Sequence, residues 1–165
     1  MPEKDLKKIV VLGTGNLLCR DEGVGIRVIE ELGKRFCFPP EVELVDGGVL
    51  GLGLLPVIEG AGDLIIIDAV INNREPGTIY RFVDGEIPER VYQKISMHEL
   101  DLLEALTIAR EIGPRTPRKI VLGVEPLDIS PWGMELTPVI EARVNDLVDL
   151  VLAELRRLGI EYQPG

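Results

Sequence analysis

The segment Lys8-Ile9-Val10-Val11-Leu12-Gly13-Thr14-Gly15 decides how this chain must fold. An aliphatic run rich in β-branched residues is typical of a buried strand, and the two glycines after it predict a turn. Apolar residues then recur at helical spacing between Val24 and Leu32. This pattern predicts a helix over about 22–36 with Asp21 as its N-cap.

Two more apolar runs extend this strand–helix unit. Residues 42–45 form the second predicted strand, which Asp46-Gly47-Gly48 closes, and a short helix is expected over 49–59. Residues 64–67 are aliphatic throughout and are followed by Asp68, as expected for a strand that is buried on both faces. The βαβαβ order predicts a parallel sheet with helices on both of its faces.

The next connection, residues 70–77, is too short for a parallel return, which needs a dozen or more residues. The strand over 78–83 should therefore be antiparallel. The remaining expected elements are a helix over about 97–111, a strand at 119–124 and a helix from Thr137-Pro138 to Gly159. The sequence thus predicts one α/β domain, residues 1–165: a three-layer sandwich with a five-stranded mixed, mostly parallel sheet.

Composition excludes several classes of protein. The chain has 165 residues and a formal net charge of −10, from 28 acidic and 18 basic residues, which argues against nucleic-acid binding. Its two cysteines do not make a secreted disulfide framework, its N-terminus lacks the pattern of a signal peptide, and no apolar run approaches 18 residues. We expect a cytoplasmic protein that does not bind membranes.

Standard hydrolase motifs are missing. There is no Gly-x-Ser-x-Gly, no Asp-Thr-Gly or Asp-Ser-Gly, and His98 is the only histidine, which excludes His-Glu-x-x-His. Gly13-Thr14-Gly15 is only a partial dinucleotide fingerprint, with Asp46 in the place of the ribose ligand. Leu18 stands where the third glycine should be, so two glycines making a tight turn is the favoured interpretation.

Two acidic residues stand where strands give way to helices or loops. Glu22 lies in Asp21-Glu22-Gly23-Val24-Gly25, which reads either as a helix cap or, because Gly23 and Gly25 lack side chains, as a place of close approach. Ligands of open α/β sheets bind at the carboxyl ends of strands, where the strand order reverses. If the first and third strands are neighbours, Glu22 and Asp68 face one crevice.

His98 lies in Ser96-Met97-His98-Glu99, which matches the capping box of a helix N-terminus. The positive helix end disfavours an imidazolium, so the ring should be neutral and able to bind a metal ion. Two carboxylates and one imidazole suit borderline divalent ions such as Ni²⁺ or Zn²⁺. Three protein ligands would leave coordination positions open.

These motifs together resemble one family, the [NiFe]-hydrogenase maturation endopeptidases. The resemblance covers nearly the whole chain. Its motifs, in order, are Gly13-Thr14-Gly15-Asn16, Asp21-Glu22-Gly23-Val24-Gly25, Asp46-Gly47-Gly48, Asp68-Ala69, Ser96-Met97-His98-Glu99-Leu100, Gly123-Val124-Glu125-Pro126 and Leu136-Thr137-Pro138.

The resemblance implies an endopeptidase that removes a short C-terminal extension from a [NiFe]-hydrogenase large-subunit precursor after nickel insertion. It assigns Glu22, Asp68 and His98 as the metal-reading and catalytic residues, with Asp46 as a further candidate that shapes the cleft. Nickel would arrive with the substrate, although other divalent ions can occupy such a site. The enzyme is expected to be a monomer.

Alternatives stay open at this point. Metal could activate a water molecule, or it could only position the substrate while a carboxylate acts as base, as in an aspartic-type mechanism. The chain could instead be a nucleotide-binding or metal-chaperone module without catalysis. A third possibility is a cysteine peptidase that uses Cys19 with His98.

Overall fold

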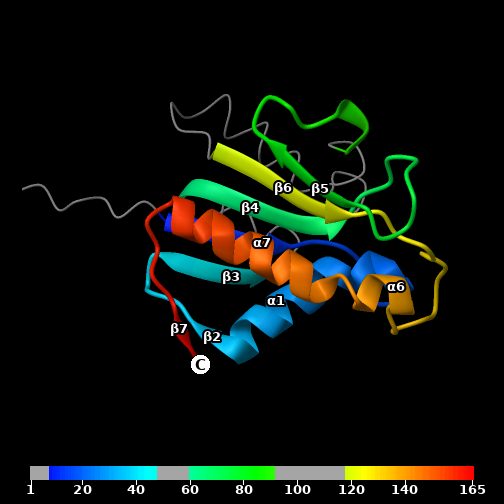
Figure 1. The fold of residues 1–165 in the computed structure, drawn as a ribbon, viewed down its shortest axis with the longest axis horizontal. Coiled ribbons are helices and arrows are strands. Elements are labelled where there is room, and N and C mark those ends of the chain that lie inside the picture. The colour runs from blue at the N-terminus through cyan, green and yellow to red at the C-terminus, as the bar shows by residue number, and fades with distance from the viewer. Residues whose placement is uncertain (1–7, 48–59, 92–117) are drawn as a thin grey trace, which may run out of the picture.

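The computed structural model of the chain describes residues 8–47, 60–91 and 118–165 (Figure 1). Its main sheet has five strands in the order β3-β1-β4-β6-β5. Their bounds are β1 Lys8–Gly13, β3 Val42–Asp46, β4 Ala61–Ala69, β5 Ile79–Val83 and β6 Arg118–Val124.

The sheet is mixed and mostly parallel, as the sequence predicted. β1 pairs in parallel with β3 and β4, and β4 pairs in parallel with β6. β5 pairs antiparallel with β6, with Tyr80 opposite Gly123, which confirms the argument from the short 70–77 connection. β1 and β4 are neighbours, and the strand order reverses between them, so the predicted switch point is present.

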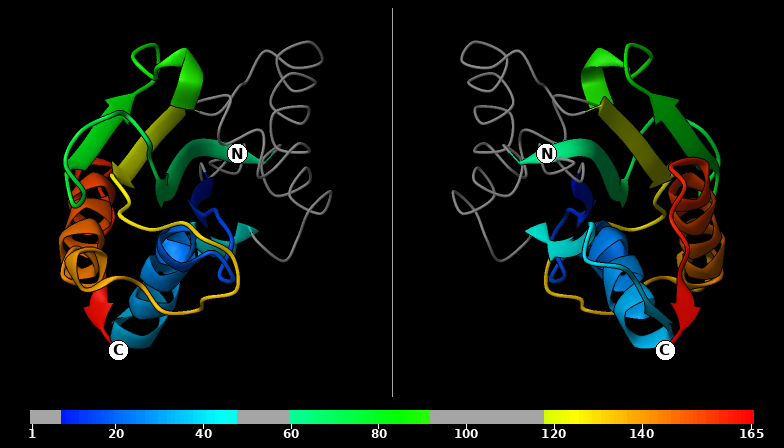
Figure 2. Two further views of the ribbon diagram at one scale, coloured as in Figure 1. Left: turned by 90° about the vertical axis from the view of Figure 1, so that its right-hand side faces the viewer. Right: turned by 90° about the vertical axis from the view of Figure 1, so that its left-hand side faces the viewer.

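Two helices, α1 (Val24–Arg35) and α7 (Val144–Arg157), lie side by side on one face of this sheet (Figure 2). Their apolar stripes pack on alternate residues of the strands, such as Val11, Ile65 and Leu122. The other set of alternate strand residues is buried in a second apolar cluster. This explains why β4 is aliphatic on both faces. The helices expected over 49–59 and 97–111 lie outside the described residues.

The last helical region differs from the prediction. The single helix expected from Thr137 is divided into α6 (Pro138–Glu141) and α7, with a turn between them. Thr137 is the N-cap residue of α6, but its side chain makes no capping hydrogen bond. The end of α7 was predicted correctly, since Gly159 follows it with a φ of +79°. No helix in the described part of the chain is long and apolar enough to cross a membrane.

A small second sheet was not predicted. β2 (Phe36–Cys37) continues directly from α1 and pairs antiparallel with β7 (Gln163–Pro164). The ring of Phe36 meets Tyr162 edge-on, with 5.4 Å between ring centroids. Such edge-to-face contacts are favourable for aromatic rings, and here they fasten the C-terminal segment to the end of α1.

Helix α1 meets the sheet almost backbone to backbone at its N-terminal end. A Cβ atom on Gly25 would lie 2.1 Å from the carbonyl oxygen of Ile67 and 2.6 Å from that of Thr14. A Cβ atom on Gly13 would lie 2.4 Å from the carbonyl oxygen of Gly25. Both sets of contacts involve backbone, which cannot move aside as a flexible side chain does, so glycine is required at both positions.

Two glycines of α1 allow a matched test of this packing. Gly25→Ala should destabilise the protein by at least about 1–3 kcal/mol, the usual cost of overpacking. Gly33→Ala, in the same helix, should be neutral or stabilise by up to about 1 kcal/mol through better helix propensity. Its new Cβ would meet only Leu44 Cδ1 at an ordinary 3.8 Å. Urea denaturation of both variants measures the difference, and equal stabilities would contradict the packing argument.

Candidate functional site

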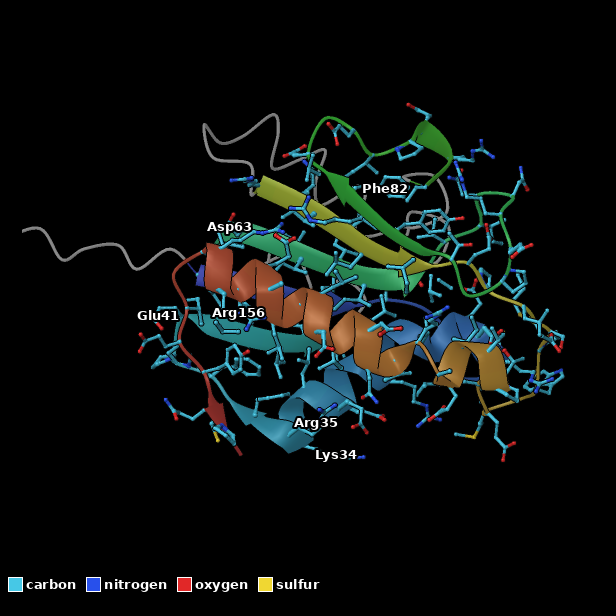
Figure 3. All side chains as sticks on the ribbon, in the orientation of Figure 1. Lys34, Arg35, Glu41, Asp63, Phe82 and Arg156 are labelled. Atoms are coloured by element: carbon cyan, nitrogen blue, oxygen red, sulfur yellow. The ribbon has the colours of Figure 1, made fainter. Side chains whose placement is uncertain are left out.

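The candidate site lies at the carboxyl edge of the sheet, where β1, β3 and β4 end. The amino ends of the strands lie at the opposite edge, where Figure 3 shows Glu41 just before β3 and Asp63 early in β4. The register pairs Gly13 of β1 with Asp46 on one side and with Ile67 on the other. The two candidate aspartates therefore come from the strands that flank the end of β1.

Glu22 reaches this edge from a short 3₁₀ turn, η1 (Arg20–Gly23), which leads into α1. Its side chain is buried, with 2% of the residue exposed. The turn packs against β4, so Glu22 is brought next to the strand that carries Asp68. A buried carboxylate can be stabilised by hydrogen bonds, by an opposite charge or by a metal ion.

Asp68 is fully buried and stands one residue before the end of β4. The sequence predicted that the strand ends at Ile67, directly before Asp68. In the structure the strand continues to Ala69, because Asp68 and Ala69 also pair with β6. Its Oδ1 atom accepts a hydrogen bond of 2.8 Å from the Ala69 N–H. The carboxylate therefore has a fixed orientation at the switch point of the sheet.

Gly15 brings these two acidic residues together. It has a φ of +121°, and a Cβ atom on it would lie 1.8 Å from the Glu22 carbonyl oxygen and 3.2 Å from Asp68 Oδ1. The loop after β1 thus passes between the η1 turn and the end of β4 with no room for a side chain. Both the backbone angle and the space require glycine here. The backbone of Glu22 and the carboxylate of Asp68 therefore lie near each other across Gly15; the crevice that their side chains would share stays a prediction.

The structure says less about the other two candidate residues, Asp46 and His98. Asp46 is half-buried at the end of β3, on the other side of β1. His98 and its capping box lie outside the described residues, so the three-residue site remains a prediction. Among residues 8–47, 60–91 and 118–165, no group of three or more His, Cys, Asp or Glu side chains is placed to hold a metal ion.

The same glycine contacts weigh against a dinucleotide at the loop after β1. In that type of site the helix N-terminus faces a pyrophosphate with free N–H groups. Here the first turn of α1 lies against the backbone of Thr14 and Ile67, and a 3₁₀ turn precedes it. Gly13 and Gly15 are both close to backbone atoms, and Gly15 has a φ of +121° as in a tight turn, which is the interpretation that the sequence favoured.

Known proteins match the chain over nearly its whole length. A sequence model of the hydrogenase maturation protease family matches residues 26–154. The hydrogenase 2 maturation protease of Escherichia coli (strain K12) is 38% identical over 158 residues, which cover 95% of this chain and 96% of that protein. The chain belongs to the hydrogenase maturation protease family.

Other relatives agree with this assignment. The hydrogenase expression/formation protein HupD of Bradyrhizobium diazoefficiens is 37% identical, covering 93% of this chain and 80% of that protein. The solved structure of the hydrogenase maturating endopeptidase HybD from E. coli superposes with a TM-score of 0.87. That match has 38% identity and covers 95% of this chain and 97% of the other. The family and the α/β fold expected from the motifs are both confirmed.

Asp21 has a different role in this maturation protease from the one predicted. It does not cap α1, whose N-cap is Gly23 and which has no side-chain cap. Its buried carboxylate instead accepts hydrogen bonds from the N–H groups of Leu127 and Asp128, at 2.9 Å each, and of Thr137, at 2.8 Å. The Thr137 hydroxyl donates to it as well, at 2.9–3.0 Å. Asp21 therefore fastens the 126–137 segment beside Glu22.

Glu125, which the sequence analysis named only within a motif and without a role, organises the neighbouring loop in a similar way. Its Oε1 atom accepts hydrogen bonds from the N–H groups of Asn72 and Arg74, at 2.9 Å each, and from the Tyr80 hydroxyl, at 2.8 Å. Glu125 is only 4% exposed. Burial, together with Glu125, raises the pKa of Tyr80 to about 12.

Replacing Asp21 should loosen the attachment of the 126–137 segment. Asp21→Asn places an amide NH₂ among N–H donors, so at least one buried donor loses its acceptor, at a cost of about 1–3 kcal/mol. Asp149→Asn, an exposed carboxylate on α7, should change stability by less than about 0.5 kcal/mol. Urea denaturation compares the two. The role of Asp21 is refuted if both variants have wild-type stability.

The raised pKa of Tyr80 predicts an alkaline loss of stability. Between pH 10 and pH 12 the folded protein keeps a proton that the unfolded chain has released, so the contribution present below pH 10 declines as pH rises. Urea midpoints at pH 9 and pH 11 should differ more in the wild type than in Tyr80→Phe. An identical pH dependence in the two proteins would show that this hydroxyl is not responsible.

Proposed function

We propose that this maturation protease removes the C-terminal extension of a [NiFe]-hydrogenase large-subunit precursor once nickel has been inserted, and that nickel is what it recognises. The observation that carries the proposal is the meeting of Glu22 and Asp68 around Gly15, two buried carboxylates from separate elements. The names of the relatives, which include a hydrogenase 2 maturation protease, support a hydrogenase as the partner.

The donor set fits a divalent ion that the substrate delivers. A divalent cation held by Glu22 and Asp68 would offset the loss of hydration that accompanies the burial of two carboxylates. Carboxylates with an imidazole from His98 suit Ni²⁺, but without a thiolate they bind it only modestly. Cysteines of the precursor would complete the coordination. An empty precursor would then lack these ligand contacts at the site and would stay uncut.

In this proposal, the acidic residues of the site have different roles in cleavage. Glu22 and Asp68, both held in place by the packing of Gly15, orient the nickel-bearing end of the precursor. Nickel, when bound there, would supply Lewis-acid character near the scissile peptide. A carboxylate at the site acts as general base toward water, for which the half-buried Asp46 at the end of β3 is a further candidate.

Isosteric variants test the proposal. Glu22→Gln and Asp68→Asn keep side-chain size but remove the charged oxygen ligand, and His98→Ala removes the nitrogen. Each should lower cleavage of nickel-loaded precursor by at least about a hundredfold, since even outer-shell partners of a metal typically contribute 10–100-fold. Glu161→Gln and Asp149→Asn, which change exposed acids, should cleave like the wild type. Intact mass of the precursor gives the readout.

The same assay separates the alternatives. Wild-type protein should leave nickel-free precursor uncut, and equal cutting of both precursors would refute nickel recognition. Cys19→Ser should retain full activity; loss of cleavage in this variant alone would favour a cysteine peptidase with Cys19 as nucleophile. A wild-type protein that binds loaded precursor but never shortens it would be a non-catalytic chaperone.

A further inference from the structure

Exposed apolar side chains gather beside the candidate site. Six large apolar residues are exposed in the described part of the chain, and five of them come from residues 18 and 127–134. We call these five the apolar patch: Leu18, Leu127, Ile129, Trp132 and Met134. Trp132 is 87% exposed and Leu127 59% exposed. Where exposed apolar side chains form a continuous surface, that surface marks an interaction site in soluble proteins.

Backbone hydrogen bonds join the two segments that carry the apolar patch. The Gly133 N–H donates to the Leu18 carbonyl at 3.0 Å, and the Arg20 N–H donates to the Gly133 carbonyl at 2.8 Å. Leu18 therefore lies next to the turn that holds Trp132 and Met134. The Leu127 N–H donates to the Asp21 carboxylate, so the start of the 127–134 segment lies beside the η1 turn, which follows Leu18.

Hydrogen bonds and an ion pair hold the loop that carries the patch. The Arg20 guanidinium donates to Asp128 at 2.8 Å and to the Glu135 carbonyl at 3.4 Å. Hydrogen bonds from the Ser130 hydroxyl and N–H, with the Arg20 charge, hold the pKa of Asp128 below its usual range. Arg20 and Trp132 both have left-handed backbone angles, with φ of +52° and +70°. Such strain in residues other than glycine is typical of functional loops.

The shape and charge beside the patch indicate what it binds. A hollow of about 500 Å³ is lined by Arg20, Pro131, Trp132, Gly133, Met134 and Glu135. A second hollow, of about 540 Å³, shares Met134 and Glu135 with the first. Its charged lining consists of Glu30, Glu31, Glu135 and Glu141 against Arg27 and Lys34. A hollow with more acidic than basic side chains therefore borders the one that Trp132 and Met134 line.

We infer that the apolar patch is the docking surface for the precursor, and that it binds an apolar segment of that protein flanked by basic residues. The inference rests on the proposed function. Three observations support it. The patch adjoins the candidate site through Arg20 and Asp21, which directly precede Glu22. Its acidic border complements basic residues, and tryptophan is one of the residue types that dominate binding energy at interfaces.

Trp132→Gly is the sharpest test, because it removes the side chain and also relieves the left-handed strain. The variant should be at least as stable as the wild type, so that lost function cannot come from unfolding. On nickel-loaded precursor its KM should rise at least about tenfold while kcat stays within about twofold, as expected when only binding is lost. Leu127→Ser should act in the same direction.

Ile71→Ser is the matched control, since Ile71 is the sixth exposed large apolar residue, at 42%, and lies outside the patch. Its KM should equal that of the wild type. An unchanged KM in Trp132→Gly, or an equal rise in Ile71→Ser, would overturn the docking surface while wild-type cleavage leaves the proposed function intact. If the wild type cuts no precursor, the proposed function itself fails.

Sedimentation velocity examines the competing occupant, a second copy of this chain. The wild type and Trp132→Gly should both sediment as monomers at the concentrations of the assay. A wild-type dimer that Trp132→Gly dissociates would overturn the inference in favour of self-association through the patch.

Discussion

The close approach of helix α1 to the sheet is the constraint on which the site depends. Gly25 allows the first turn of the helix to lie against the carbonyl oxygens of Thr14 and Ile67. On strand β1, Gly13 leaves room for the carbonyl group of Gly25. Any Cβ at these positions would push the helix outward by an ångström or more. The 3₁₀ turn before α1 would move with it. The burial of Glu22 beside the end of β4 is thus a consequence of missing side chains elsewhere.

Two adjacent acidic residues of that turn have separate roles. Asp21 is engaged by N–H and O–H donors that lie 106–116 residues further along the chain. Its charge is compensated inside the protein, which makes it a structural residue. Glu22 points its backbone carbonyl at Gly15, close to the Asp68 carboxylate. The first residue fixes the loop that surrounds the site, and the second is the one proposed to meet the substrate.

Features that depend on local rules could be predicted from the sequence. The antiparallel β5 follows from the length of residues 70–77, and the shared edge of Glu22 and Asp68 follows from the order of parallel strands. Features that depend on distant partners could not. Asp21 and Glu125 look like a helix cap and a loop residue, because nothing nearby reveals donors many tens of residues away. The turn that divides α6 from α7 also leaves no proline or glycine signal at Ala142 and Arg143.

Under the proposed function, the arrangement suggests how a protease that binds nickel weakly could still be selective. Two carboxylates and an imidazole would bind nickel modestly, so affinity for the precursor must come from elsewhere. Binding energy gained at a remote, rigid surface can be used to hold the reacting groups in place, provided that surface and site move as one unit. Here the η1 turn connects the patch with the site. Its residues Arg20 and Asp21 hold the 126–137 segment, and Glu22 follows them directly. A precursor docked on the patch would therefore present its nickel-bearing end to Glu22 and Asp68 with little freedom left, and one without nickel would dock but lack the final ligand contacts.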